Sequence, residues 1–167
     1  MALRINSKAP DFSLQDSEGT EFRLQSGLDK NGVMLFFYPK AFSPGCTKEV
    51  CRFSDEYRLF SDAGIRLVGI SHDLPETLHR FRTRHSVPFT LLSDPRRTVC
   101  RMYDAVYPFG LLTKRISYYI DGSGIIRHYS DNLLNPEAHL REFRSYFQKN
   151  PLKITTDQTA AFHSLKA

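Results

Sequence analysis

The sequence predicts an α/β fold in which one central sheet is flanked by helices on both faces. Residues 33–38 and 65–71 are almost continuously apolar, as expected for strands that are covered on both faces. Apolar residues at helical spacing follow these runs, and a pair of short strands is indicated near each end of the chain. The resulting order, ββ, βα, βα, βα, ββ, α, is typical of an α/β domain.

Length and composition favour one domain. The chain has 167 residues, of which 41% are hydrophobic and 25% are charged, and these are values of a globular protein. We expect the domain to span residues 1–149 and residues 150–167 to form an appended tail of unknown role. No apolar run approaches the roughly 18 residues of a membrane span, and residues 1–11 lack the apolar core of a signal peptide. We therefore expect a cytoplasmic protein without a membrane partner.

Charge and cysteine content exclude several classes of function. The net charge of +5 comes from arginines spread along the chain, with no basic motif interleaved with aromatics, so we expect solvated helix faces rather than nucleic-acid binding. Three cysteines form no framework pattern, which favours thiol chemistry in a reducing compartment over a secreted disulfide scaffold. No cysteine or histidine group has zinc spacing, so we expect no metal.

In the first half of the chain, residues 12–23 alternate around the turn 16–19 and predict a hairpin. Its inward side chains are expected to be Phe12, Leu14 and Phe22. A strand over 33–38 is followed by a helix over about 43–62, which Gly64 ends.

After the strand 65–71, Asp73, Pro75 and Glu76 predict an N-cap, a first-position proline and a capping-box acid for a helix to about His85. A short strand over 90–92 comes next. The remaining predicted elements are a helix capped by Asp94-Pro95 and running to about Tyr103, a hairpin over 116–129, and a final helix that begins at Asn135-Pro136.

The loop between the strand 33–38 and the helix that follows it is suited to a reactive thiolate. Ser43 is a good N-cap hydroxyl and Pro44 suits the first helical position, so Cys46 is expected in the first turn. Unpaired N–H groups and the positive end of the helix dipole favour an anion there, and they lower a thiol pKa from about 8.5 to roughly 3.5–7.5.

The helix places its cysteines differently. Cys46 begins an apolar stripe that continues through Val50, Phe53, Tyr57 and Phe60, and this periodicity alone also fits a buried structural cysteine. Cys51 is rotated by roughly 140° from Cys46, so ideal helix geometry separates their Cα atoms by about 8.6 Å. A disulfide tolerates about 7 Å, so a bond between them requires the first turns of the helix to unwind.

The spacing Pro39-x-x-x-Ser43-x-x-Cys46 resembles the active-site signature of the peroxiredoxins, and the flanking residues resemble their bacterioferritin comigratory protein (Q-type) branch. The resemblance runs from about residue 4 to 149. It rests on Phe37-Tyr38-Pro39-Lys40, Pro44-Gly45-Cys46-Thr47-Lys48-Glu49, Cys51, Lys8-Ala9-Pro10-Asp11-Phe12, Leu91-Leu92-Ser93-Asp94-Pro95 and Arg115-Ile116-Ser117-Tyr118-Tyr119-Ile120-Asp121.

This resemblance implies a thioredoxin-like fold with a central mixed sheet and an added N-terminal hairpin. It also implies catalytic roles for Cys46, which attacks the peroxide, and Cys51, which resolves the product. Pro39 would close the pocket over Cys46, although it also fits a strand terminator. Ser43, where the family more often has threonine, would orient the peroxide, and Arg115 would stabilise the thiolate, although a solvated strand-end arginine is the alternative.

Two further features qualify the site. Cys100 lies among apolar residues and fits a core position, but it stays a reserve candidate for the resolving cysteine. Ala41 and Phe42 differ from the small or acidic residues that are usual in the family, which leaves the substrate preference open.

The resemblance thus implies a thiol peroxidase that reduces hydrogen peroxide and alkyl hydroperoxides with thioredoxin or a similar dithiol, and we expect a monomer, as for this branch. No cofactor is implied. The alternatives are a non-catalytic redox sensor or chaperone-like switch and, third, a disulfide reductase, which the spacing Cys-x-x-x-x-Cys disfavours.

Overall fold

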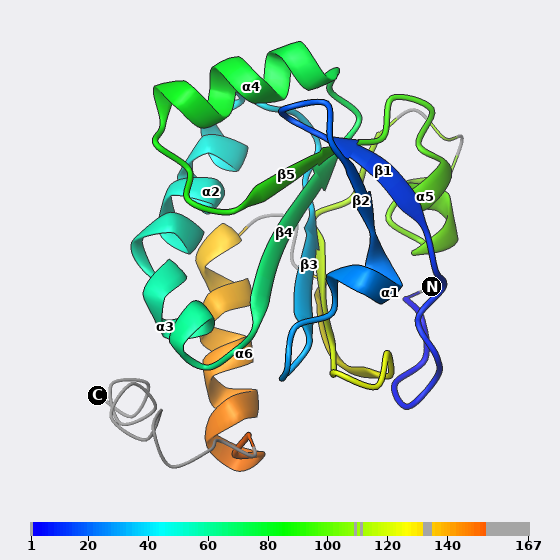
Figure 1. Ribbon diagram of the computed structural model, residues 1–167, viewed down its shortest axis with the longest axis vertical. Helices are drawn as coiled ribbons and strands as arrows, with labels where there is room; N and C mark the ends of the chain where they lie inside the picture. Colours follow the sequence, from blue (N-terminus) through cyan, green and yellow to red (C-terminus); the bar gives the residue numbers. More distant parts are fainter. Residues whose placement is uncertain (1, 109, 111, 132–134, 153–167) are drawn as a thin grey trace.

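All strands join one sheet, as the computed structural model of residues 2–108, 110, 112–131 and 135–152 shows (Figure 1). They are β1 (Ser13–Asp16), β2 (Glu21–Arg23), β3 (Val33–Phe37), β4 (Arg66–Ser71), β5 (Thr90–Ser93), β6 (Ile116–Ile120) and β7 (Ile126–Asp131). Their spatial order is β2-β1-β5-β4-β3-β6-β7. Strand β4 runs parallel to β3 and β5, whereas the other neighbours are antiparallel. The predicted α/β fold with a mixed sheet and an N-terminal hairpin is confirmed.

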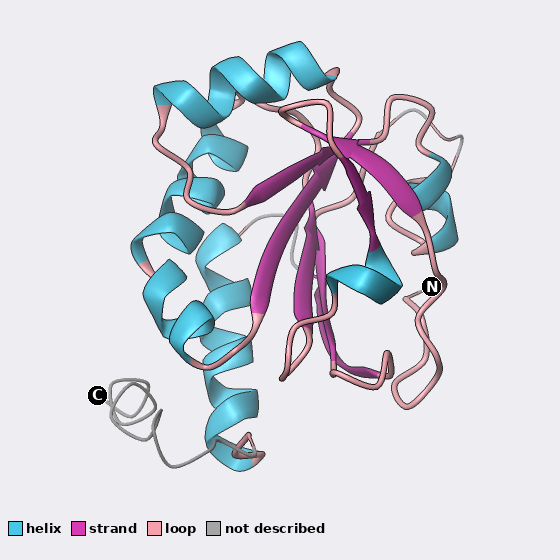
Figure 2. Cartoon of the chain, viewed as in Figure 1, coloured by secondary structure: helices cyan, strands magenta, loops and turns pink. Residues whose placement is uncertain are grey.

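Helices cover both faces of the sheet (Figure 2). They are α1 (Leu24–Gly27), α2 (Pro44–Asp55), α3 (Tyr57–Asp62), α4 (Pro75–Arg84), α5 (Thr98–Met102) and α6 (Pro136–Lys149). Strand β3 is buried on both sides, so its alternate side chains enter two cores. Met34 and Phe36 lie in the core under α2, α3, α4 and α6, whereas Leu35 and Phe37 lie in the core under α1 and α5.

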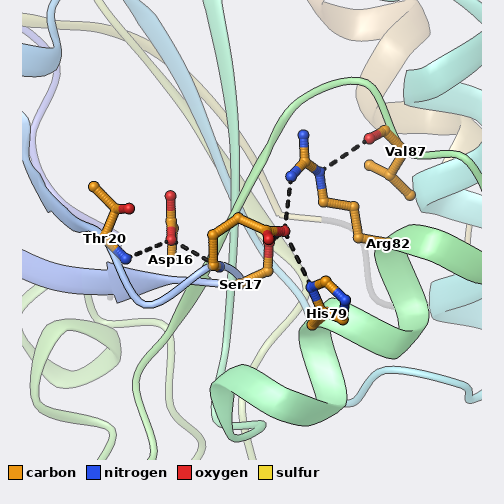
Figure 3. A network of polar contacts seen from close by, with 7 residues as sticks. Asp16, Ser17, Thr20, His79, Arg82 and Val87 are labelled. Atoms are coloured by element: carbon orange, nitrogen blue, oxygen red, sulfur yellow. Dashed lines mark hydrogen bonds and ion pairs between the residues drawn. The ribbon is translucent and has the colours of Figure 1, made fainter.

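The N-terminal hairpin is tied to α4 by a small polar network (Figure 3). Asp16 Oδ1 accepts the backbone N–H groups of Glu18 and Thr20, at 2.8 and 2.9 Å, which fixes the turn between β1 and β2. The Glu18 carboxylate then accepts from Arg82 at 3.0 Å and contacts His79 Nδ1 at 3.2 Å. These contacts hold the predicted hairpin against the rest of the domain, although the groups are solvent-exposed and each pair contributes little stability.

The prediction of one long helix over 43–62 is wrong in one respect, because the structure has two helices there, α2 and α3, which are separated at Glu56. The backbone of Glu56 leaves the helical region at φ −100° and ψ 4°. Its carboxylate forms two contacts with the Arg144 guanidinium of α6, at 3.0 and 2.8 Å. Neither glycine nor proline marks the break, so the local sequence contains no signal for it. The apolar stripe nevertheless continues into α3, where Phe60 is buried.

One of the two helix caps predicted from aspartates is wrong, because the carboxylate of Asp73 binds groups outside its helix. The N-cap of α4 is Leu74, and Asp73 Oδ2 instead accepts from the Ala41 backbone N–H at 2.7 Å and from the Ser71 hydroxyl at 2.8 Å. Helix α5 begins at Thr98, later than predicted, but Asp94 caps it as predicted, because its carboxylate accepts the first-turn N–H groups of Thr98 at 2.9 Å and Cys100 at 2.8 Å. The single-turn helix α1 was not predicted.

The C-terminal helix begins at Pro136, as predicted, and Asn135 Oδ1 accepts the Ala138 backbone N–H at 3.2 Å. Of the predicted tail 150–167, only residues 150–152 are described, and Leu152 packs against the core under α6. The other fifteen positions of the tail lie outside the described residues. Within the described part of the chain, no helix combines the length and the apolarity that crossing a membrane requires.

Candidate active site

The loop between β3 and α2 is held from the neighbouring strand. Its Ala41 backbone N–H donates to the buried Asp73 carboxylate, which follows the end of β4. Phe42 has a φ of 62°, a left-handed conformation that is uncommon for a non-glycine residue and turns the chain sharply into the helix. Its ring is 44% exposed and packs edge-on against Phe81 of α4, with ring centroids 5.0 Å apart. The loop is therefore fixed at two points.

Ser43 occupies the N-cap position of α2, as predicted, but its side chain does not cap the helix. The hydroxyl instead donates to the Lys40 carbonyl at 3.0 Å. Pro44 stands at the start of the helix and no acidic side chain lies in the first turn. The first N–H groups of α2 consequently have no side-chain partner at the cap and keep their preference for an anion.

Cys46 lies in this first turn and is buried, with 1% of its surface exposed. Arg115 Nη2 is 3.6 Å from its sulfur. The contact follows from the sheet, because Phe37 at the end of β3 pairs with Ile116, the residue after Arg115. Gly45 leaves room for the guanidinium, since a Cβ at that position would lie 3.3 Å from Nη2. The structure thus brings together Cys46 and Arg115, the cation that only the resemblance selected.

Glu49 is a site residue that sequence reasoning did not identify. It lies three positions after Cys46 on the same helix, is fully buried, and accepts a hydrogen bond from Arg115 Nη1 through its Oε2. Burial raises the pKa of its carboxyl group to about 8, although the Arg115 charge acts in the opposite direction. Its signal in the sequence is an acidic residue on the buried side of α2, next to Val50.

Cys51 lies on α2 but is not in contact with Cys46, because all three cysteines are free thiols and α2 is continuous between the two. The ideal-helix separation of about 8.6 Å between their Cα atoms therefore applies to the folded state. Cys51 is half-buried, so the second thiol is partly accessible.

Cys100 is remote from this site. It lies in the core under α1 and α5, on the opposite face of the sheet from Cys46. Burial raises the pKa of its thiol far above the ordinary value, and the Asp94 carboxylate adds to this effect. Pro39, by contrast, is half-buried and lies two residues after the end of β3, where the loop begins.

Comparison with known proteins places these residues in context. The sequence profile of the AhpC/TSA family matches residues 5–129. The chloroplastic peroxiredoxin Q of Sedum lineare is 38% identical over 137 residues, which are 81% of this chain and 73% of that protein. A protein of Coxiella burnetii named putative peroxiredoxin bcp is 39% identical over 132 residues, 75% of this chain and 87% of that protein. The chain spans only 63% of the length of the rice peroxiredoxin Q proteins, to which it is 36% identical.

Solved structures agree with the fold. Peroxidoxin BcpB from Mycobacterium tuberculosis superposes with a TM-score of 0.81 at 31% identity, over 88% of this chain and 97% of that chain. A peroxiredoxin Q structure from Xanthomonas campestris has a TM-score of 0.75 at 24% identity, over 83% of this chain and 90% of that chain.

Proposed function

The chain belongs to the AhpC/TSA family, in its peroxiredoxin Q and bcp branch, and on this premise we propose that it is a thiol-dependent peroxidase. The observation that carries the proposal is the Arg115 guanidinium 3.6 Å from the sulfur of Cys46, in the first turn of a helix. A fixed cation and unpaired N–H groups are the environment that makes a buried thiol nucleophilic.

In the first step, the Cys46 thiolate attacks the terminal oxygen of a hydroperoxide. The S–O bond forms as the O–O bond breaks, the sulfur is oxidised to sulfenic acid, and the leaving oxygen takes a proton to become water or an alcohol. Arg115 stabilises the thiolate and the charge that develops on the leaving oxygen, since it is held by Glu49 and does not have to reorganise. Pro39 limits access of water, and the Ser43 hydroxyl turns from Lys40 towards the peroxide.

In the second step, the Cys51 thiol condenses with the Cys46 sulfenic acid, forming the disulfide and releasing water. A dithiol such as thioredoxin then supplies two electrons and two protons and restores both thiols. The distance between the two cysteines requires α2 to unwind over its first turns before the disulfide forms.

We also propose that the protein works as a monomer, because the resolving thiol is on the same helix and no second chain has to supply it. A cytoplasmic location is proposed from the three free thiols, which suit a reducing compartment. We propose neither a nucleic-acid nor a membrane partner, and we propose residues 1–149 as the catalytic domain. Sedimentation velocity and cell fractionation test the first two proposals, with a plastid as the competing location.

The deciding experiment is the consumption of peroxide in an assay coupled to thioredoxin and its reductase, with hydrogen peroxide and an alkyl hydroperoxide in parallel. We expect steady turnover with both. If the folded protein reacts once with peroxide but none of the common dithiols supports turnover, the peroxidase proposal is wrong and the redox-sensor alternative is favoured.

A further inference from the structure

A buried polar cluster extends from the active site into the interior through two residues that the proposed reaction does not use. Ser117 of β6 and His139 of α6 are both fully buried. Ser117 Oγ and His139 Nδ1 are 2.7 Å apart, and the same Nδ1 is 3.8 Å from Glu49 Oε1. Glu49 in turn pairs with Arg115, which contacts Cys46. The polar contacts are therefore continuous from β6 and α6 to the reactive sulfur.

The cluster is not explained by packing. Burying polar groups costs free energy unless each is hydrogen-bonded, and a hydrophobic core would be less costly. Among the described residues, no donor lies within hydrogen-bond distance of Glu49 Oε1, and His139 is the ionisable group that faces this atom. Its position on α6 belongs to the apolar stripe that continues with Phe143 and Phe147. We therefore attribute the histidine at this position to its polar contacts rather than to packing.

Within the part of the chain that the structure describes, four ionisable groups lie around Glu49. Cys46 shares its helix, Arg115 precedes β6, His139 comes from α6, and Tyr38 follows β3. Burial holds the pKa of the Tyr38 hydroxyl far above its ordinary value, so Tyr38 stays neutral. The Arg115 guanidinium contacts both the sulfur of Cys46 and the Glu49 carboxyl group. An ionised Glu49 attracts the guanidinium more strongly than a neutral one, and therefore weakens its stabilisation of the Cys46 thiolate.

We propose that His139, oriented by Ser117, is a positioning residue that keeps Glu49 protonated in the reduced protein and so leaves the Arg115 charge to Cys46. In this proposal the Ser117 hydroxyl is the donor in its 2.7 Å contact with Nδ1, so the imidazole carries its proton on Nε2 and none on Nδ1, the nitrogen nearer Glu49. A ring in this tautomer cannot donate to Oε1, so it does not stabilise ionisation of that oxygen. The inference rests on the proposed role of the Arg115–Cys46 contact.

The test follows the reactivity of Cys46 directly, without peroxide turnover. We would measure the rate of Cys46 alkylation by iodoacetamide against pH, in a Cys51→Ser, Cys100→Ser background. In His139→Gln, the amide N–H can donate to Oε1, so Glu49 ionises more readily and draws Arg115 away. We expect the half-point, the pH at which the alkylation rate is half its maximum, to rise by about one unit. At pH values below this half-point, the fraction of Cys46 thiolate would fall about tenfold. Ser117→Ala frees the imidazole tautomer and should shift the half-point in the same direction by less.

Two controls separate this role from a structural one. His128→Gln changes another histidine that packs on α6, against Tyr146 and Phe143, but lies outside the cluster, and its profile should match the parent. Combining His139→Gln with Glu49→Gln should abolish the shift, because the amide that replaces the Glu49 carboxyl group cannot ionise.

Thermal melting verifies that each variant folds, and Ser117→Ala takes over the test if His139→Gln does not. The proposal is overturned if folded His139→Gln and folded Ser117→Ala both keep the half-point of the parent protein. It is also overturned if the shift in half-point persists in the Glu49→Gln background. Failure of the proposed peroxidase function would appear separately, as absent turnover in the coupled assay with an unchanged alkylation profile.

Discussion

Cys46 and Cys100 are buried to nearly the same extent, but charges of opposite sign surround them. Cys46 is 1% exposed and has the Arg115 guanidinium 3.6 Å from its sulfur. Cys100 is fully buried in the core on the other face of the sheet, where the Asp94 carboxylate accepts its backbone N–H at 2.8 Å. Burial, and then the Asp94 charge, raise the pKa of the Cys100 thiol far above its ordinary value.

The comparison shows that two equally buried thiols can have opposite electrostatic surroundings. Desolvation favours the neutral form of a buried thiol, so a buried cysteine that reacts as a thiolate needs neighbouring charges or dipoles that oppose this effect. At Cys46 the helix N-terminus and the arginine stabilise an anion, whereas at Cys100 a carboxylate opposes one. One cysteine is thereby suited to chemistry and the other to packing.

The largest expected effect comes from exchanging sulfur for oxygen at each position. Cys46→Ser should reduce peroxide consumption to the uncatalysed rate, because a serine hydroxyl is not ionised near neutral pH. Cys100→Ser should retain turnover within a few-fold of the parent, since no step uses that thiol. Stopped-flow peroxide consumption checks both, and retained activity in folded Cys46→Ser would refute the central assignment.

A second experiment asks which cysteine resolves the intermediate. Peroxide should produce a Cys46–Cys51 disulfide, seen as a mass loss of about 2 Da, with loss of helix signal and faster amide exchange across residues 43–53. Reduction should reverse both changes. Cys51→Ser should react once, stop at the sulfenic acid, and climb to the sulfinic acid at excess peroxide.

The matched control is Cys100→Ser, which should still form the disulfide and unwind α2. Normal thioredoxin-linked turnover of Cys51→Ser, with Cys46 joined to Cys100 in peptide maps, would make Cys51 a bystander. That disulfide would have to cross the sheet, since the two thiols lie in cores on its opposite faces.

A smaller effect is expected from removing the cation that distinguishes the two thiols. Arg115→Ala should slow oxidation of Cys46 by roughly 10- to 150-fold, because a hydrogen bond to a charged group contributes about 1.5–3 kcal/mol. It should also destabilise the fold, since it leaves the Glu49 carboxyl group buried without its partner. Adding Glu49→Gln should restore part of the stability but not the rate, whereas Arg101→Ala, an exposed arginine beside Cys100, should change neither.

The last prediction concerns the pH dependence of stability rather than the reactivity of either thiol. Because the pKa of Glu49 is raised from 4.5 to about 8 on folding, the native state binds more protons than the unfolded state between these values. Stability from this group is therefore complete below about pH 4.5 and is lost as the pH rises through about 8. Urea unfolding at several pH values should show a decline in the parent that is weaker in Glu49→Gln; parallel curves would contradict the assignment.

Much of the fold was predictable because its signals are local. The apolar runs at 33–38 and 65–71 predict strands that are covered on both faces, and both form such strands. Pro44 and the spacing of the loop place Cys46 in the first turn of a helix, and Asn135-Pro136 begins the last one. The residues that carry each of these signals are neighbours in the chain, so the element can be predicted from a short stretch of sequence.

Charges that act across the fold were not predictable in this way. Arg115 is 69 residues from Cys46 in sequence, and only the pairing of β3 with β6 sets it beside the sulfur. The carboxylate of Asp73 was predicted as a helix cap but binds the backbone N–H of Ala41, 32 residues away in sequence. Such long-range contacts depend on which strands are neighbours, a choice made by the burial of whole faces. The sequence by itself therefore determined where the thiol lies along the chain, and the tertiary structure decided which charges surround it.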